Sequence, residues 1–403
     1  MKVFIEGSHA VAEAVKRCKP GVVCAYPITP QTHIVERLSE MVADGDLKAE
    51  FINVESEHSA ASVVLGSTAT GVRSYTATSS QGLILMAEVL FNIAGMRLPV
   101  VLTCVNRSLS APINIWNDHQ DSMTIRDAGW IQLYAENNQE VHDLHFIAYR
   151  IAEDKNIMLP CMVCMDGYIL SHGYEVVDLA EQEMVDKFLP PYQPEYKLDP
   201  EEPLTLGLLG DPNYYMETRW AIQETMKEAL DLLPKIESEF SENFKRQQPV
   251  LVEEYKTQDA EKILVALGSV AGTVKEVVDE LRKEGEKVGL LRIIAFRPFP
   301  KDQVFNALKN ADKIGILDKS ISLGSVSPVY MEISSLFQER GINKNISGFV
   351  VGLGGRDITP EVVKEIFKLL DEKPQAVRFV DLREWYSEKS PIYNWESVVQ
   401  STK

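Results

Sequence analysis

The 403-residue chain has few cysteines and no long apolar stretch, and these two features argue against a disulfide-rich secreted protein and against a membrane-spanning protein. Five cysteines are an odd and small number, which argues against a secreted disulfide framework. No segment approaches the roughly 18 uninterrupted apolar residues of a membrane span. Glu6 and Gly7 interrupt the N-terminus before an apolar region forms, so a secretory signal is not expected. We therefore expect a cytoplasmic protein.

Positive charge is also scarce in this sequence. Lysine and arginine number 41 against 59 aspartates and glutamates, which gives a formal net charge of −18. A surface this acidic repels phosphate backbones and anionic lipids, so neither nucleic acid nor a membrane is an expected partner. A small anionic substrate is still compatible, because one arginine in a dry site outweighs a distant field.

Familiar ligand-binding motifs are missing as well. The glycine-rich runs 268–272 and 352–355 fall short of a dinucleotide fingerprint, and the sequence has no P-loop and no HExxH spacing. Cys161 and Cys164 form a lone CxxC in an apolar, strand-like run. Alternation along a strand would point the two thiols to opposite faces, so we expect buried structural cysteines. No metal site is expected in this chain.

What the sequence does contain, up to about residue 170, is a regular alternation of short apolar runs and helical patterns. The short runs are rich in Val, Ile and Tyr, as buried parallel strands are. This alternation predicts an α/β fold with a parallel sheet covered by helices on both faces. The expected strands are 22–26, 51–54, 72–78, 99–105, 130–134 and 159–165. The expected helices are 10–18, 33–42, 58–70, 83–94 and 140–153.

A connector and a second, smaller α/β unit follow. Residues 189–203 contain five prolines, which leave little helix or sheet. A helix is expected over 217–233, and the alternation resumes at Lys262. The strands expected there are 263–267, 288–294, 313–317 and 348–352, and the helices are 273–283, 303–309 and 328–338.

These patterns divide the chain into four parts. We predict a first domain over 1–240, a linker over 241–260, a second domain over 261–372 and a C-terminal arm over 373–403. The arm carries Trp385, Tyr386, Tyr393 and Trp395 among charges. Aromatic side chains in a terminal segment need a surface to pack on, so we expect the arm to lie over another surface.

Thr29 and Pro30 stand where an expected strand turns into a helix. Thr29 is predicted to N-cap a helix whose first residue is Pro30, where a missing N–H costs nothing. In a parallel sheet this point lies at the carboxyl edge, where ligands bind. A well-capped structural helix is the alternative.

Three further strand ends carry polar residues. Glu55, Glu57 and His58 follow one strand, where a carboxylate is either a first-turn charge on a helix or an acid able to pass a proton to a ring nitrogen. Residues 76–82 end in small polar residues and a glycine, which lets backbone approach a flat ligand. Arg107 follows a fourth strand, where its guanidinium suits a carboxylate; a surface ion pair is the alternative.

Several long motifs carry a resemblance to a known family. The motifs are AYPITPQT, VESEHSA, TATSSQGLILMAEVLF, GMRLPVVLTCVNRSLSAPINIWNDHQDSM, RDAGWIQLYAENNQEVHDL and MDGYILSH, then ILVALGSVAGT, RPFP and GLGGRDIT. In this order they resemble the alpha chains of pyruvate:ferredoxin oxidoreductases, within the thiamine diphosphate-dependent 2-oxoacid:acceptor oxidoreductases. The resemblance implies a thiamine pyrimidine-binding domain followed by a smaller domain like the C-terminal domain of transketolase.

The resemblance also implies roles for individual residues. Glu57 would hydrogen-bond the aminopyrimidine ring and promote ylide formation. Thr29 would contact the substrate and the cofactor amino group, and Arg107 would bind the 2-oxoacid carboxylate. The implied cofactor-binding residues are Pro27, Ile28, Thr29, Glu57 and Gln81.

The implied reaction is oxidative decarboxylation of a 2-oxoacid with coenzyme A, giving acyl-CoA, CO₂ and reduced ferredoxin or another reduced acceptor, as in anaerobic metabolism. Pyruvate is the favoured substrate, and branched-chain or aryl 2-oxoacids such as phenylglyoxylate are alternatives. A non-catalytic assembly subunit and a self-contained nucleotide-binding enzyme are the rival functions.

Partner chains are implied as well. The sequence has no Gly-Asp-Gly motif for a diphosphate-bound metal, since Gly210 and Asp211 are followed by Pro212, and it has no cysteine set for an iron–sulfur cluster. The resemblance therefore implies that thiamine diphosphate is shared with a beta chain. Mg²⁺ and [4Fe–4S] clusters would lie on partner chains, and gamma and delta chains would complete the complex.

Overall fold

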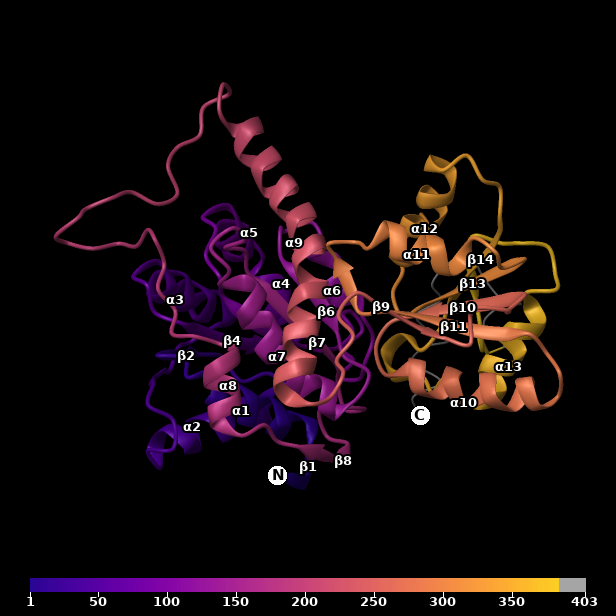
Figure 1. Ribbon diagram of the computed structural model, residues 1–403, viewed down its shortest axis with the longest axis horizontal. Coiled ribbons are helices and arrows are strands. Elements are labelled where there is room, and N and C mark those ends of the chain that lie inside the picture. The colour runs from indigo at the N-terminus through magenta and orange to yellow at the C-terminus, as the bar shows by residue number, and fades with distance from the viewer. Residues whose placement is uncertain (384–403) are drawn as a thin grey trace.

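The computed structural model describes residues 1–383, which form two large sheets, each flanked by helices, and one two-stranded sheet (Figure 1). Most of the predicted C-terminal arm, with Trp385, Tyr386, Tyr393 and Trp395, lies outside the described residues. Its first part contains β15 (Arg378–Phe379), which joins the edge of the second sheet. Every helix among residues 1–383 is too short or too polar to traverse a lipid bilayer.

The N-terminal sheet has seven strands within the described residues, in the order β12-β6-β7-β5-β4-β2-β3. The strands are β2 (Val22–Cys24), β3 (Glu50–Ile52), β4 (Ser74–Thr78), β5 (Val101–Asn106), β6 (Ile131–Tyr134), β7 (Cys161–Asp166) and β12 (Ala295–Arg297). All neighbours run parallel except β12, which pairs antiparallel with β6. The predicted parallel sheet is confirmed, whereas β12 comes from the second half of the chain and no pattern predicts its place.

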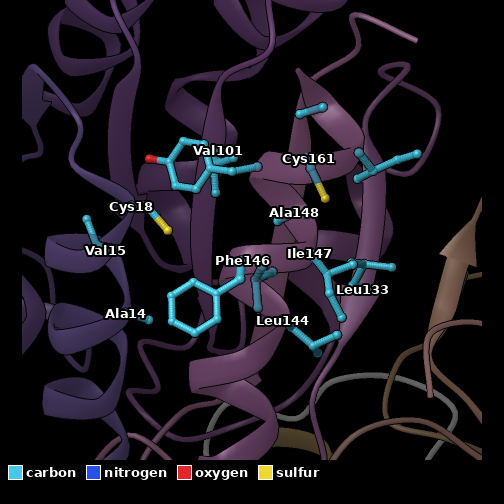
Figure 2. Packing of buried hydrophobic residues seen from close by; sticks show 14 of the residues in the cluster. Ala14, Val15, Cys18, Val101, Leu133, Leu144, Phe146, Ile147, Ala148 and Cys161 are labelled. Carbon is cyan, nitrogen blue, oxygen red and sulfur yellow. The ribbon is translucent and has the colours of Figure 1, made fainter. Parts of the chain in front are cut away.

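Helices cover both faces of this sheet, as predicted. One core lies under α1 (Gly7–Cys18), α2 (Thr32–Ala43), α7 (Asn138–Ala152), α8 (Gln182–Phe188) and α9 (Tyr215–Phe244). Figure 2 shows Phe146 of α7 turned toward α1, where Ala14 and Val15 lie. The other core lies under α3 (Glu57–Ala69), α4 (Ser80–Leu85), α5 (Ala87–Gly95) and α6 (Gln120–Thr124).

The strand β7 shows how the sequence assigns side chains to these two cores. Cys161 belongs to the core under α1 and α7, and Cys164 belongs to the core on the opposite face. Both thiols are buried and free, and burial raises the pKa of the Cys161 thiol. The prediction of two structural cysteines on opposite faces is confirmed.

The second sheet has six strands within the described residues, in the order β15-β14-β13-β10-β11-β9. Its elements are β9 (Val252–Tyr255), β10 (Lys262–Ala266), α10 (Val270–Lys283), β11 (Val288–Ile293), α11 (Lys301–Leu308), β13 (Lys313–Asp318), α12 (Pro328–Glu339), β14 (Asn345–Val350), the short 3₁₀ turn η1 (Leu353–Gly355), α13 (Pro360–Leu369) and β15. The four inner strands are predicted correctly. The edge strands β9 and β15 are missed because each is short and flanked by charged residues.

Three other elements depart from the sequence pattern. The strands β1 (Lys2–Glu6) and β8 (Tyr174–Asp178) form a separate antiparallel pair. The helix α9 continues through Pro234 to Phe244. The rings of Phe240 and Phe244 stack at 4.4 Å inside the core, so burial there offsets the roughly 3 kcal/mol that an interior proline costs.

The residues before α9 form the predicted extended connector. Residues 189–214 contain no helix or strand, and Figure 1 shows them as a long loop reaching away from the N-terminal sheet. Leu208 and Leu209 lie in this loop and are exposed. The proline-rich composition therefore predicts the local structure correctly.

The two sheets are joined by a shared apolar core and by buried charges. Trp130 and Tyr134 from the first half belong to the same core as Ile263 and Phe296 from the second half. Arg292 of β11 is buried, and its two terminal nitrogens lie 2.6 and 2.7 Å from the carboxylate oxygens of Glu140 in α7. The second half is therefore docked rigidly on the first.

Candidate active site

The carboxyl ends of β2, β4, β5 and β7 lie at one edge of the N-terminal sheet, because these strands are parallel neighbours. The chain leaves them at Cys24, Thr78, Asn106 and Asp166. The segments predicted to carry chemistry follow three of these ends and the neighbouring end of β3. The structure therefore brings the predicted site segments together at one edge.

The turn after β2 differs from the prediction at Thr29. The helix α2 begins at Thr32, with Gln31 in the N-cap position, so the prediction that Thr29 caps a helix starting at Pro30 is wrong. The cause is the buried side chain of Gln31, whose Nε2 donates to Ala77 O (2.9 Å) and whose Oε1 accepts from Ile28 N (3.2 Å). These bonds hold a turn against β4 before the helix starts, and they leave Thr29 exposed.

The remaining residues of this turn differ in exposure. Pro27 is exposed, and Ile28 is half-buried. Both residues precede Thr29 in the turn that follows β2. They are therefore accessible to a molecule bound there.

Glu57 is the buried acid among the polar residues after β3. It is the first residue of α3, whose N-cap residue Ser56 accepts from Ser59 N (3.3 Å). Only 7% of Glu57 is exposed, whereas Glu55 and His58 are exposed. The structure thus separates these three candidates and leaves Glu57 as the acid shielded from solvent.

Gly82 in α4 fixes the place of the Glu57 carboxyl group. A Cβ atom at position 82 would lie 2.6 Å from Glu57 Oε1 and 2.5 Å from Thr78 Oγ1. Both distances are too short for a real side chain, so the carboxyl group lies directly against the glycine backbone. The close approach of a flat ligand to this backbone stays a prediction; the close neighbours that the structure shows at Gly82 are Glu57 and Thr78.

The residues that precede Gly82 carry polar atoms without partners. Among the described residues, Thr78 Oγ1, Ser79 Oγ and Gln81 Nε2 are buried without a hydrogen-bond partner. Ser80, between them, has a positive φ of 48°, which a non-glycine residue rarely adopts. Buried polar groups normally have partners, so this cluster points to a ligand with hydrogen-bonding atoms.

Arg107 lies at the end of β5 and is buried. Its Nη1 donates to Thr29 O (2.9 Å), and its Nε donates to Asn114 O (2.9 Å). Within residues 1–383 it forms no ion pair, and burial lowers the pKa of its guanidinium. The alternative of a surface ion pair therefore does not hold, and the guanidinium retains capacity for an anion.

Asp121 connects these segments through hydrogen bonds. Its role was not predicted from the sequence. The carboxylate is fully buried, and its Oδ2 accepts from Arg107 N (2.9 Å) and Ser80 N (3.0 Å). Its Oδ1 accepts from Asn106 Nδ2 (2.8 Å). Burial raises its pKa, while these bonds to the charged form oppose the shift. The polar run that contains Asp121 predicts a solvated loop, so only its place in a long family motif could have indicated a role.

A second missed acid, Asp166, ends β7. It is buried, and its Oδ1 lies 2.7 Å from His119 Nε2 while its Oδ2 lies 2.9 Å from Lys319 Nζ. Burial alone would raise its pKa, but Lys319 and His119 hold the pKa well below its usual range. Because Lys319 follows β13, this ion pair connects the site edge to the second domain.

Comparison with protein families assigns both parts of the chain. Residues 13–238 match the family described as pyruvate flavodoxin/ferredoxin oxidoreductase, thiamine diphosphate-binding. Residues 260–363 match core domain II of pyruvate:ferredoxin oxidoreductase. The two matches cover most of the described residues.

The chain is also similar over nearly its full length to curated relatives. It is 50% identical over 380 residues to the pyruvate synthase subunit PorA of Methanothermobacter thermautotrophicus, covering 94% of this chain and 98% of the relative. It is 51% identical over 384 residues to PorA of Methanocaldococcus jannaschii, with the same coverage. It is 42% identical over 387 residues to the ketoisovalerate oxidoreductase subunit VorA of Pyrococcus horikoshii, covering 96% and 98%.

Solved structures share the fold. A 2-oxoglutarate:ferredoxin oxidoreductase from Magnetococcus marinus matches with a TM-score of 0.66 at 18% identity, covering 92% of this chain and 65% of that longer chain. A split-gene transketolase matches with a TM-score of 0.53 at 12% identity, covering 92% and 99%. The chain therefore shares its α/β fold with these two structures. The family matches and near-full-length relatives show that the chain belongs to the pyruvate flavodoxin/ferredoxin oxidoreductase family.

Proposed function

We propose that this chain is the alpha-type subunit of a multi-subunit 2-oxoacid:ferredoxin oxidoreductase that acts on pyruvate. The observation that carries the proposal is the identity of 50–51% to pyruvate synthase subunits over nearly the whole of both chains. The ketoisovalerate relative is less similar, at 42% identity, which favours pyruvate over a branched-chain 2-oxoacid. The overall reaction converts the 2-oxoacid and coenzyme A into acyl-CoA and CO₂ while electrons pass to ferredoxin.

The residues at the sheet edge fit the pyrimidine part of thiamine diphosphate. The aminopyrimidine ring offers both donors and acceptors, and Thr78 Oγ1, Ser79 Oγ and Gln81 Nε2 are buried groups without partners there. Glu57, Gln81 and the turn from Pro27 to Thr29 are the residues that we propose to hold it. When bound, the cofactor supplies a carbon nucleophile and a sink for the electrons left by CO₂.

In this proposal Glu57 exchanges a proton with a ring nitrogen of the cofactor. Its burial keeps water away from the carboxyl group, and Gly82 keeps that group in a single place. Arg107 holds the substrate carboxylate, since its charge has no acidic partner among the described residues. Thr29 is exposed, its carbonyl oxygen accepts from Arg107 Nη1, and in this proposal it contacts both substrate and cofactor.

Partner chains supply the rest of the enzyme in this proposal. The diphosphate and its Mg²⁺ lie on a beta-type chain, because this sequence carries no Gly-Asp-Gly motif. The [4Fe–4S] clusters lie on partner chains too, because the five cysteines here are all buried and free. Gamma- and delta-type chains and ferredoxin complete the assembly, which we place in the cytoplasm. We also propose the domain division 1–240, 241–260, 261–372 and 373–403.

The experiment is Glu57→Gln in the purified complex, assayed by 2-oxoacid-dependent reduction of ferredoxin. Loss of the exchangeable acid should lower turnover by about a hundredfold or more, the usual contribution of a general acid–base group. The control is Glu55→Gln, since Glu55 is exposed two residues away and should leave turnover unchanged. Full activity of Glu57→Gln would favour the rival reading of a non-catalytic assembly subunit, and rates with pyruvate, 2-oxoisovalerate and phenylglyoxylate would rank the substrates.

A further inference from the structure

A glycine loop of the second domain lies against the segment that covers Arg107. The glycine loop is residues 352–355, and the segment is residues 114–118 of the first domain. Three hydrogen bonds join them: Asn114 Nδ2 to Gly354 O (3.0 Å), Gly354 N to Asp118 Oδ2 (3.1 Å) and Gly355 N to Asn117 O (2.7 Å). Two elements more than 230 positions apart in the sequence thus form one contact.

The same segment holds the guanidinium of Arg107. The carbonyl oxygen of Asn114 accepts from Arg107 Nε (2.9 Å), and Asn114 Oδ1 accepts from Ser108 Oγ (2.7 Å) and Trp116 N (2.8 Å). Asn114 therefore bonds the glycine loop through its side-chain amide and Arg107 through its backbone. A displacement of Asn114 would therefore also displace the guanidinium group of Arg107.

The glycines are needed at this contact. Gly354 has a φ of +62°, and a Cβ atom there would lie 2.6 Å from Asn114 Nδ2. A Cβ atom at Gly355, whose φ is +80°, would collide with Trp116 Cβ. The glycine-rich run that falls short of a dinucleotide fingerprint thus has a different use here, which is close approach to a neighbouring segment.

The second domain also contacts this edge at residues outside the glycine loop. Next to the 114–118 segment, His119 N donates to Lys319 O (2.8 Å), and Ile321 N donates to Gln120 Oε1 (3.0 Å). Lys319 also pairs with the buried Asp166. These contacts fix the second domain relative to the edge that carries Arg107, so the loop can act as a rigid support.

We propose that the glycine loop 352–355 and Asn114 are positioning elements for the substrate carboxylate site, acting through the guanidinium of Arg107. The second domain, which contributes none of the predicted catalytic side chains, thereby determines how well the 2-oxoacid is bound. The inference rests on the proposed role of Arg107 and adds a function for the second domain.

The test compares Gly354→Ala with Gly341→Ala in the purified complex. Gly341 has a similar φ of +69° and has no atom within 4 Å of an added Cβ, so both variants carry the backbone strain and only the first displaces Asn114. Asn114→Ala is the second variant, because it removes the contact without backbone strain. For each protein, KM for the 2-oxoacid, KM for coenzyme A, kcat and the thermal unfolding midpoint are measured.

We expect Gly354→Ala and Asn114→Ala to raise KM for the 2-oxoacid by about tenfold or more, the effect of a displacement of roughly an ångström. KM for coenzyme A and kcat should change little, because the lost interaction binds the substrate and its transition state equally. Gly341→Ala should match the unmodified complex in both KM values and in kcat. Equal KM values in Gly354→Ala, Asn114→Ala and Gly341→Ala would overturn the inference.

Arg107→Gln separates this inference from the proposed function. If Arg107→Gln raises KM for the 2-oxoacid while Gly354→Ala and Asn114→Ala leave it unchanged, only the positioning inference fails. If Arg107→Gln itself leaves KM unchanged, the proposed role of Arg107 fails and the inference fails with it.

Discussion

Glu57 and Gly82 share a space that has room for one side chain. The carboxyl group of Glu57 occupies the volume that a Cβ atom at position 82 would need. A glycine in α4 thus determines the orientation of an acid in α3. The two residues act as a unit although 25 positions separate them in the sequence.

Gly82→Ala is expected to disable the site without unfolding the protein. The added methyl group must push Glu57 or Thr78 aside, and a displaced acid should lower turnover by about a hundredfold. The measurement is kcat of the purified complex together with its unfolding midpoint. Gly66→Ala is the control, since Gly66 lies inside α3 with nothing near an added Cβ, and it should add about 0.5–1 kcal/mol of stability. Normal turnover in Gly82→Ala would contradict this reading.

At the residue scale, the sequence placed some polar residues at this sheet edge and gave no signal for others, and their roles stay predictions. Arg107 directly follows β5, and Glu57 begins the helix after β3, so local pattern places both at the carboxyl edge. Asp121 and Asn114 stand in a polar loop, where composition predicts solvent exposure, and their contacts are with residues distant in the sequence. The wrong prediction that Thr29 caps a helix has the same origin. Gln31 donates to the carbonyl oxygen of Ala77 in β4, and no local sequence pattern reveals this contact.

At the scale of elements, β13 and α12 meet at a buried carboxyl group. Asp318 ends β13, and its Oδ2 accepts from Val329 N (3.1 Å) and Tyr330 N (3.2 Å) in the first turn of α12. Burial raises the pKa of Asp318 to about 7, and these backbone bonds only partly oppose the shift. The junction therefore holds a proton at a pH where an exposed aspartate has lost it.

The stability of this junction should fall as the pH rises. Between about pH 4 and pH 7 the folded protein binds more protons at Asp318 than the unfolded chain does, so ionisation favours unfolding over that interval. Relative to Asp318→Asn, which does not titrate, the unmodified protein should lose roughly 1–4 kcal/mol of stability from pH 4 to pH 7. Unfolding midpoints of both proteins across this range provide the test, and parallel profiles would refute it.

Elements were predictable where their pattern is local. The strands β4, β5 and β7 are buried on both sides and consist mostly of apolar and small residues, and the helices between them repeat apolar residues at helical spacing, so their order and type follow from the sequence. The helix α9 was cut short in the prediction at Pro234, because the stacked Phe240 and Phe244 that extend it pack on distant residues such as Phe188. Tertiary packing, which a single sequence does not reveal, decides its length.

At the scale of the whole molecule, a buried ion pair links the two domains. Lys319 and Asp166 are almost fully buried, and neither has access to solvent that could replace the partner. The low pKa of Asp166 adds stability that is present above about pH 4 and is lost as the pH falls through the folded value. This contact therefore contributes to domain docking at neutral pH.

Lys319→Met should destabilise the protein strongly. It leaves the Asp166 carboxylate buried without its main partner, and breaking one side of such a pair costs about 3–5 kcal/mol. The loss should be largest at neutral pH and smaller in acid, where Asp166 is protonated. Lys301→Met removes an exposed pair with Glu339 and should cost less than about 1 kcal/mol. Similar unfolding midpoints for the two variants would contradict the expected difference.

The presence of two helix-flanked sheets was predictable, but the connection between them was not. The apolar core that contains Trp130 also contains Ile263 and Phe296, and these contacts join the two halves of the sequence. Composition and periodicity report which residues are apolar and say nothing about which distant residues they meet. The shared core, and the contacts through which the second domain supports Arg107, both join residues far apart in the sequence, so neither could be predicted.

The strand β12 has a consequence for how the protein is made. Residues 295–297 complete the first sheet by pairing with β6, and Phe296 places its ring edge-on against Tyr134 at 6.4 Å. During synthesis, the ribosome must therefore release the chain beyond residue 297 before the first sheet can be completed. Until then β6 is an open edge, which is a template for pairing with other chains. A gene fragment that stops at the apparent domain boundary would carry this exposed edge permanently and should yield aggregated protein.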